Sequence, residues 1–196
     1  MNAIAADAAS LSGSKVVVER ANGLSLQSND FELFGLSEGF AQDPKSLESQ
    51  WKRLQGETHP DKFAAQGAAA QRLSMQWSVR INEAYQRLKD PVQRGAYLCE
   101  LRGQHIRAED NTAMPHAFLM QQMEWRESLD EAGDNVPALL ALWGNTSATQ
   151  TQYLLDLAQA LDVDNDIARA AECVRALMFI DNFSRSVRQR IDELDD

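Results

Sequence analysis

Two amphipathic segments joined by a short loop constrain the fold of this chain more than any other feature. In the first segment, Leu47, Trp51 and Leu54 recur at helical spacing and form one apolar stripe. The second segment runs from about Ala68 to Lys89 and carries a longer stripe of the same kind. Because the loop between them is short, the two helices are expected to pack antiparallel, with the loop exposed at one tip.

The rest of the chain also predicts helices, so the expected fold class is all-α. The one β-branched run, Val16–Val18, lies in the N-terminal 28 residues, which we interpret as a flexible tail. Asp43 and Pro44 favour a helix start, because Asp caps free amides and Pro suits the first helical position. Further helices are expected over Asn29–Leu36 and, after Asp90-Pro91, over a shorter segment that ends at Gly103. Beyond it, helices are expected over about Pro115–Ala132, Val136–Leu161 and Asp164–Leu194, and Gly144–Ser147 could break the middle one.

A polar stretch with Gly, Asn, Thr and Pro lies between Gly103 and Pro115 and predicts a domain boundary. The three helical segments beyond it have short connections, which favours an antiparallel bundle. The expected organisation is a tail over 1–28, a first domain over 29–103, a linker over 104–114 and a C-terminal three-helix domain over 115–196.

The formal net charge of −10 argues against nucleic acid or anionic lipid as the main partner. Binding to phosphate needs clustered Lys and Arg, and an acidic chain repels such polymers. The sequence has no uncharged apolar run long enough to span a membrane. We therefore expect a protein partner, with no nucleic acid and no membrane, and a monomeric chain.

The two cysteines, Cys99 and Cys173, lie in apolar helical settings at unrelated spacing. They are interpreted as small core residues in a reducing compartment. A zinc site would need CxxC pairs, which the sequence lacks, so neither a metal nor another cofactor is expected. The N-terminal stretch lacks the basic start and apolar core of a secretory signal, and we expect a cytoplasmic protein.

The loop between the two amphipathic helices reads His59, Pro60, Asp61 and is the most informative motif. One interpretation is a plain turn, in which Pro60 fixes φ and Asp61 accepts local amide bonds. That interpretation gives no reason for an imidazole at position 59. The context of the motif is specific, since the preceding helix carries Lys45, Lys52 and Arg53 on its non-apolar side and a longer antiparallel helix follows.

On these features, residues 29–103 resemble a J domain. The resemblance implies that the loop and the basic helix before it dock on a DnaK-type ATPase and stimulate ATP hydrolysis. Opposite charges would then steer the encounter. The residues expected to bind the chaperone are His59, Pro60, Asp61, Lys52, Arg53 and Lys62.

Two features depart from the J-domain pattern. Thr58 occupies the position where J domains usually carry Tyr, so an aromatic contact is missing. Glu48 and Glu57 dilute the basic helix, whose net charge over residues 45–58 is only +1 because three basic residues face two glutamates. Both departures indicate weak docking or a specialised partner.

The segment after the predicted boundary has a second apolar face. Phe118, Gln122, Trp125 and Leu129 fall on one stripe at about 100° per residue, which is the natural core face. A second group of apolar residues points to the other side, among carboxylates. It is either a binding surface, to which Met adapts well, or part of a wide buried arc; the pattern alone leaves both open. This second group is Leu119, Met120 and Met123.

The strings FLMQQMEWRESLDE and Leu177-Met-Phe-Ile-Asp, placed after a J domain and a linker, resemble the HscB family of iron–sulfur co-chaperones. The likeness covers residues 30–194 and implies an HscA-type ATPase as the J domain's partner. It also implies that the C-terminal domain binds the cluster scaffold protein IscU. Phe179 lies off the apolar stripe Cys173–Leu177–Ile180–Val187, which suggests a role outside the core. The implied scaffold-binding residues are Leu119, Met120, Met123, Glu124, Glu127, Glu131 and Phe179.

The two alternatives to this function are an enzyme and a general J protein. As an enzyme, the chain would use His59 and Asp61 as a base and its orienting group, but these lie on an exposed loop and no Ser, Cys or metal ligand set accompanies them. As a general J protein, it would serve another client. Gly/Phe-rich linkers and CxxCxGxG repeats, which such proteins often carry, are missing from the sequence. We therefore expect a binding protein with a specific client.

Overall fold

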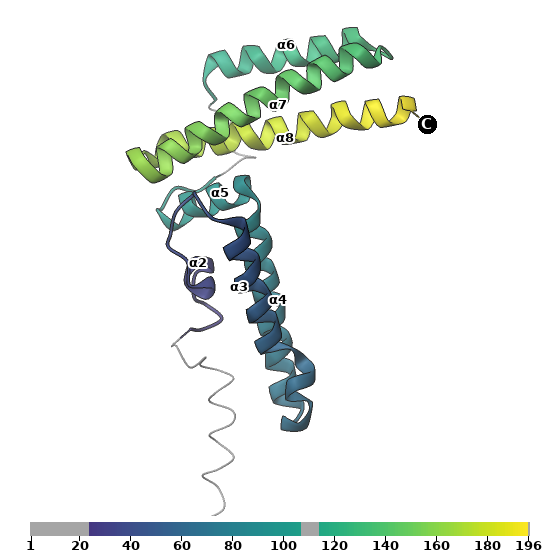
Figure 1. The fold of residues 1–196 in the computed structure, drawn as a ribbon. Coiled ribbons are helices and arrows are strands. Elements are labelled where there is room, and N and C mark those ends of the chain that lie inside the picture. Colours follow the sequence, from purple (N-terminus) through teal and green to yellow (C-terminus); the bar gives the residue numbers. More distant parts are fainter. Residues whose placement is uncertain (1–23, 107–113, 196) are drawn as a thin grey trace, which may run out of the picture. The chain divides into compact units, whose positions relative to one another are not determined.

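The computed structural model describes residues 24–106 and 114–195, and every regular element in these two ranges is helical (Figure 1). This confirms the predicted all-α class. The described chain forms two compact units, one built from residues 24–38 and 42–90 and the other from residues 39–41, 91–106 and 114–195. The elements are α2 (Asp30–Phe34), α3 (Pro44–Thr58), the 3₁₀ helix η1 (Pro60–Gln66), α4 (Ala68–Lys89), α5 (Pro91–Leu101), α6 (His116–Ala132), α7 (Val136–Ala158), the π-helical turn η2 (Gln159–Asp164) and α8 (Ile167–Asp195).

The start and end of α3 follow from local chemistry, as predicted. The Asp43 side chain accepts hydrogen bonds from the backbone N–H of Lys45 (3.3 Å) and Ser46 (3.0 Å). Pro44 occupies the first turn, where its missing N–H costs nothing. The helix ends at Thr58, because the following Pro60 disfavours helical geometry in the residue before it.

In the first unit, α3 and α4 form the expected antiparallel hairpin, and α2 packs against both. The predicted stripes turn inward: Leu54, Trp77 and Ile81 are buried. Trp51 is half-buried and stacks on Tyr85, with 4.7 Å between the ring centroids. The hairpin therefore presents its loop at one tip, as the sequence indicated.

A buried carboxylate connects α2 to α4. Asp30 is fully buried, and its oxygens lie 2.6 Å from the guanidinium of Arg80 and 2.8 Å from that of Arg87. Arg80 also donates to the backbone carbonyls of Leu26 (3.1 Å) and Ser28 (2.8 Å). Residues 24–28 are thus part of the packed unit, although the sequence placed them in the tail. The remainder of the predicted tail, residues 1–23, lies outside the described residues.

Helix α5 packs on α7 and α8, so its contacts place it in the second unit, although the sequence placed it in the first domain. Gly95 explains this packing. A Cβ atom built at Gly95 would lie 2.7 Å from Leu157 and 3.3 Å from Val174, so only glycine allows the helices to approach this closely. Of the predicted linker, residues 107–113 lie outside the described residues.

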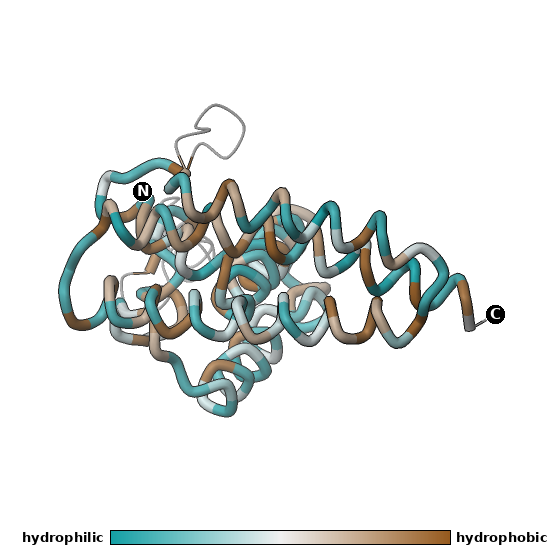
Figure 2. Tube along the Cα trace, turned by 90° about the horizontal axis from the view of Figure 1, so that it is seen from above, coloured by the Kyte–Doolittle hydropathy of each residue, from teal (hydrophilic) through white to brown (hydrophobic). Residues whose placement is uncertain are grey.

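Helices α6, α7 and α8 form the predicted C-terminal bundle (Figure 1). Figure 2 shows apolar residues recurring along the helices between hydrophilic ones, as expected where one face is buried. The possible break at Gly144–Ser147 does not occur, and α7 continues through it. Thr146 is fully buried there and donates its hydroxyl to the carbonyl of Trp143 at 3.0 Å. No helix of the described ranges has the length and apolar content to cross a membrane.

Candidate functional site

The loop between α3 and α4 exposes two polar side chains. His59 and Asp61 are 58% and 87% exposed, and His59 Nδ1 lies 3.5 Å from a carboxylate oxygen of Asp61. The backbone N–H of Asp61 donates to His59 Nδ1 at 3.3 Å, and the N–H of Lys62 donates to the His59 carbonyl at 3.0 Å. Pro60 begins η1. The loop is therefore an ordered turn with an accessible imidazole and carboxylate, suited to contacting another protein.

Thr58, which replaces the usual Tyr, points inward. It is 6% exposed, and its hydroxyl donates to the carbonyl of Leu54 at 2.9 Å. The side chain therefore adds nothing to the outer surface of the loop. An aromatic contact with a partner at this position is absent, as the sequence indicated.

Lys52 and Arg53 are each paired with a glutamate of their own helix, α3. Lys52 Nζ lies 2.7 Å from Glu48, and an Arg53 guanidinium nitrogen lies 2.6 Å from Glu57. The hydrogen bond between Lys52 and Glu48, with their charge attraction, raises the pKa of Lys52 and lowers that of Glu48. All four side chains are about half-exposed or more, so solvent screens these pairs and a partner's carboxylates can replace the glutamates.

The second apolar face of α6 is exposed. Leu119, Met120 and Met123 are 39%, 44% and 54% exposed, whereas Phe118 and Trp125 on the opposite side are buried. The three residues are therefore not part of a wide buried arc, which was one of the two alternatives that the sequence pattern left open. Three exposed carboxylates share this side of the helix. We call this surface the α6 outer face: Leu119, Met120, Met123, Glu124, Glu127 and Glu131.

Phe179 lies at the edge of the core, outside its fully buried set. Phe179 is partly buried and packs against the core of the C-terminal bundle. Its ring stacks on Trp125 and Phe183, with centroid distances of 6.4 and 6.1 Å, and meets Phe118 edge to face at 5.8 Å. Neighbouring helices cover a wider arc of α8 than the stripe through Leu177 suggested.

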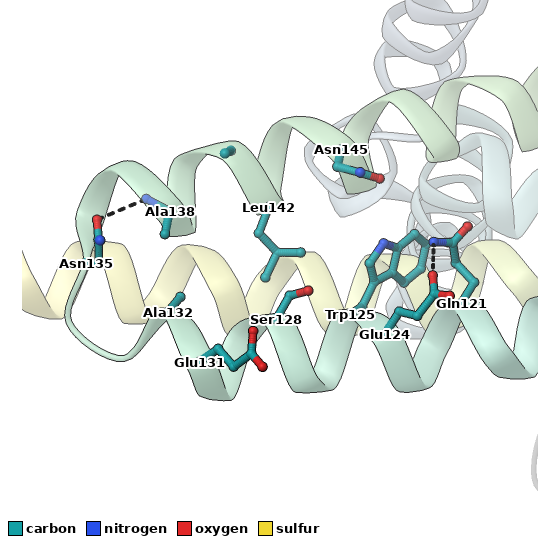
Figure 3. A pocket seen from close by; sticks show the side chains of 11 residues that line it. Gln121, Glu124, Trp125, Ser128, Glu131, Ala132, Asn135, Ala138, Leu142 and Asn145 are labelled. Carbon is teal, nitrogen blue, oxygen red and sulfur yellow. Dashed lines mark hydrogen bonds between the residues drawn. The ribbon is translucent and has the colours of Figure 1, made fainter.

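A groove of about 550 Å³ runs between α6 and α7. Glu124 and Glu131 of the α6 outer face also line it, beside Gln121, whose amide donates to Glu124 at 3.4 Å (Figure 3). The indole N–H of Trp125 is buried beside the groove without an acceptor in the described structure. The two carboxylates are thus accessible from the groove and from the outer face, which the sequence pattern did not indicate.

The two cysteines are buried, which confirms their interpretation as core residues. Burial raises the pKa of both Cys99 and Cys173 to about 11. The thiolate is the reactive form, so both thiols are unreactive near neutral pH while the chain is folded. Within the described ranges, no group of three or more His, Cys, Asp or Glu side chains is arranged to hold a metal ion.

This burial predicts the pattern of alkylation. At pH 7.5 the folded chain is expected to take up almost no iodoacetamide at Cys99 or Cys173, whereas the chain unfolded in urea should be modified at both. Mass spectrometry of intact protein measures the number of labels. Rapid labelling of the folded chain, at the rate of a free thiol, would contradict the burial described here.

Comparison with known proteins extends over most of the chain. A family model described as the HSCB C-terminal oligomerisation domain matches residues 114–188. The co-chaperone protein HscB homolog of Burkholderia mallei is 45% identical over 174 residues, which are 88% of this chain and 99% of the relative. The homolog of Burkholderia multivorans is 47% identical over the same length and shares.

Two solved structures resemble most of this chain. The chaperone HscB from Vibrio cholerae is 36% identical with a TM-score of 0.74, and the match covers 85% of this chain and 99% of that one. The human co-chaperone protein HscB is 26% identical with a TM-score of 0.78, covering 83% and 82% of the two chains. The hairpin with its exposed His59–Asp61 loop is typical of a J domain, and a separate C-terminal helical domain follows it. At this identity and coverage, the chain belongs to the HscB family of co-chaperones.

Proposed function

We propose that the chain binds an IscU-type iron–sulfur scaffold protein and delivers it to a specialised HscA/DnaK-type chaperone, whose ATPase it stimulates. In this role it is a binding protein, not an enzyme, and it assists the maturation of iron–sulfur proteins. The observation that carries the proposal is the α6 outer face, an exposed apolar surface with carboxylates around it in a co-chaperone that also exposes a J-domain loop. Such apolar surfaces on soluble domains are typical of protein-binding sites.

The two sites divide the work. The His59–Asp61 loop, with Lys52, Arg53 and Lys62, would contact the ATPase, and the α6 outer face would contact the scaffold. Leu119, Met120 and Met123 supply adaptable apolar anchors, while the three glutamates supply charge that selects a basic partner surface. Phe179 of α8 supports this face from the core side, since its ring stacks on Trp125 of α6.

The proposal is tested with purified partners. Calorimetry of the chain with an IscU-type scaffold should give saturable binding, and ATP hydrolysis by an HscA-type chaperone should rise when the chain is added. Stimulation without scaffold binding would instead favour a J-domain co-chaperone for a different client. If the chain neither binds the scaffold nor stimulates the ATPase, the proposal is wrong.

The oligomeric state and location are parts of the same proposal. We propose a cytoplasmic monomer, although the matched family model is described as an oligomerisation domain. Light scattering at concentrations used for partner binding measures the mass directly. A dimer mass at those concentrations would contradict the monomer.

Reversing the charge of Lys52 tests electrostatic docking on the ATPase. The Lys52→Glu variant should associate more slowly than the wild type, because it replaces an attractive charge with a repulsive one. Association of the wild type should also slow as salt rises, since screening acts over about 8–10 Å near physiological ionic strength. Stopped-flow or surface-based kinetics with the ATP-bound chaperone measures both rates.

Glu48→Gln provides the matched control. It frees Lys52 from its partner at 2.7 Å and removes one negative charge, so association should become faster. If the association rate is the same for the wild type and both variants, and does not depend on salt, electrostatic steering through α3 is excluded.

A further inference from the structure

A continuous set of polar contacts connects α3 to α4, from an exposed end at Asn82 to a buried end next to the His59–Asp61 loop. At one end, Asn82 Oδ1 accepts from Trp51 Nε1 (2.9 Å) and Gln55 Nε2 (2.6 Å). Gln55 Nε2 also lies 3.5 Å from the carbonyl of Ser78. We call these contacts the polar seam; its members are Trp51, Gln55 and Thr58 from α3 and Ser74, Ser78 and Asn82 from α4.

The other end of the seam holds the last carbonyl of α3. The Thr58 carbonyl accepts from the hydroxyls of Ser74 (2.9 Å) and Ser78 (3.2 Å). The last four carbonyls of a helix lack intrahelical donors, and a buried carbonyl without a donor is unfavourable. Two hydroxyls from the neighbouring helix therefore satisfy both lone pairs of this one oxygen.

The serines occupy positions where an apolar residue would ordinarily serve better. Ser74 is 1% exposed, and Ser78 is half-buried, on the side of α4 that faces α3. Serine is a weak helix former because its hydroxyl competes for backbone groups. Here both hydroxyls reach across to another helix, and a longer side chain would hold α4 farther from Thr58.

The position of Thr58 determines the position of His59. Thr58 is the residue directly before the loop, and its hydroxyl is bonded to Leu54 within α3. Its side chain and its carbonyl are thus both held. The loop itself is closed by the Asp61 and Lys62 amides, which both bond to His59. A shift of the Thr58 carbonyl would therefore move the imidazole and the Asp61 carboxylate together.

We infer that Ser74 and Ser78 are positioning residues for stimulation of the ATPase. By holding the Thr58 carbonyl, they set the direction in which His59 and Asp61 are presented to the chaperone. The inference rests on the proposed function, because it assigns these serines to the same chaperone contact. Misplacing an interacting group by about 1 Å can lower a rate by about a hundredfold, so a modest loosening of the loop has a measurable effect.

The test is the double variant Ser74→Ala, Ser78→Ala, titrated into an assay of ATP hydrolysis by the HscA-type chaperone. Maximal stimulation at saturating concentration should fall by at least about threefold. The concentration that gives half-maximal stimulation should change by less than about twofold, because Lys52 and Arg53 on the outer side of α3 are untouched. Ser78→Thr, which keeps a hydroxyl at that position, should retain wild-type stimulation.

Two measurements separate positioning from general destabilisation. Ile81→Val removes one buried methyl group from α4 without touching the seam, so it should lower the melting temperature while keeping maximal stimulation. Hydrogen exchange by NMR should be faster at the Asp61 amide in the double variant, with the Trp51 indole N–H at the far end of the seam unchanged. The single variant Ser78→Ala keeps one donor, folds more readily than the double variant and should have an intermediate effect.

The outcomes are distinguishable. A double variant with wild-type maximal stimulation and unchanged Asp61 exchange overturns the positioning role. An equal loss in Ile81→Val overturns it too, because stability would then explain the effect. A wild-type chain that stimulates no ATPase overturns the proposed function itself, and the positioning role with it.

Discussion

Exchanging His59 for Gln is expected to abolish stimulation of the partner ATPase while leaving the fold intact. The imidazole is 58% exposed at the tip of the α3–α4 hairpin, where it can reach a partner directly. Exposed substitutions of this kind usually change stability by no more than about 0.5 kcal/mol. The measurement is ATP hydrolysis by the HscA-type chaperone at saturating concentrations of variant and wild type.

The controls for this variant are its melting temperature and its affinity for the scaffold. Both should stay close to the wild-type values, because His59 lies in the first unit and the α6 outer face lies in the second. A His59→Gln chain that still stimulates fully would show that the loop is a turn without a role in docking.

Cutting Leu119, Met120 and Met123 to Ala together is expected to remove scaffold binding. Buried apolar anchors dominate the energy of protein interfaces, so each strong anchor should contribute at least about tenfold in affinity, or about 1.4 kcal/mol. The isolated chain should remain folded, because these side chains are 39–54% exposed and a loss of about 2–5 kcal/mol per residue applies only to fully buried ones. Calorimetry beside thermal melts of the same protein measures both effects.

The chain offers a matched control for the triple variant. Leu140, Leu155 and Val163 are also exposed apolar residues of the second unit, at 46%, 61% and 69% exposure, and they lie outside α6. Cutting these three to Ala removes a comparable apolar surface and should leave scaffold affinity unchanged. Equal losses from the two triple variants would contradict a specific site on α6.

The carboxylates of the α6 outer face should have a smaller effect. Changing Glu124, Glu127 and Glu131 to Ala should weaken scaffold binding less than the apolar triple variant does, because exposed charges contribute little to affinity. The same change should reduce the dependence of scaffold binding on salt.

A variant with Leu119, Met120 and Met123 changed to Ala that folds and binds like the wild type would overturn the proposed scaffold site.

Helix boundaries that depend on local chemistry were predictable. The cap at Asp43 and the end of α3 before Pro60 each involve residues within a few positions along the chain, and the structure has both as expected. The seam residues Ser74 and Ser78 carried a weaker signal. Two hydroxyls four residues apart beside the buried stripe indicate a polar contact, but its acceptor, Thr58, lies 16 residues away from Ser74.

Contacts between distant helices were not predictable in the same way. The ring of Phe179 reaches Trp125, and Gly95 lets α5 approach Leu157, because of how whole helices pack. A helical pattern gives the direction of a side chain around its own axis. It does not give the number of neighbours around that axis, so the buried arc of α8 was underestimated.

The sequence alone determined the helical class, the hairpin and the exposed His59–Asp61 loop, because periodicity, capping and proline act over a few residues. Only the tertiary structure decided that Leu119, Met120 and Met123 stay outside the core. Helices α7 and α8 cover the Phe118 and Trp125 side of α6 and leave its opposite side open. The apolar pattern of α6 is compatible with either outcome, because burial depends on which surfaces the neighbouring helices supply.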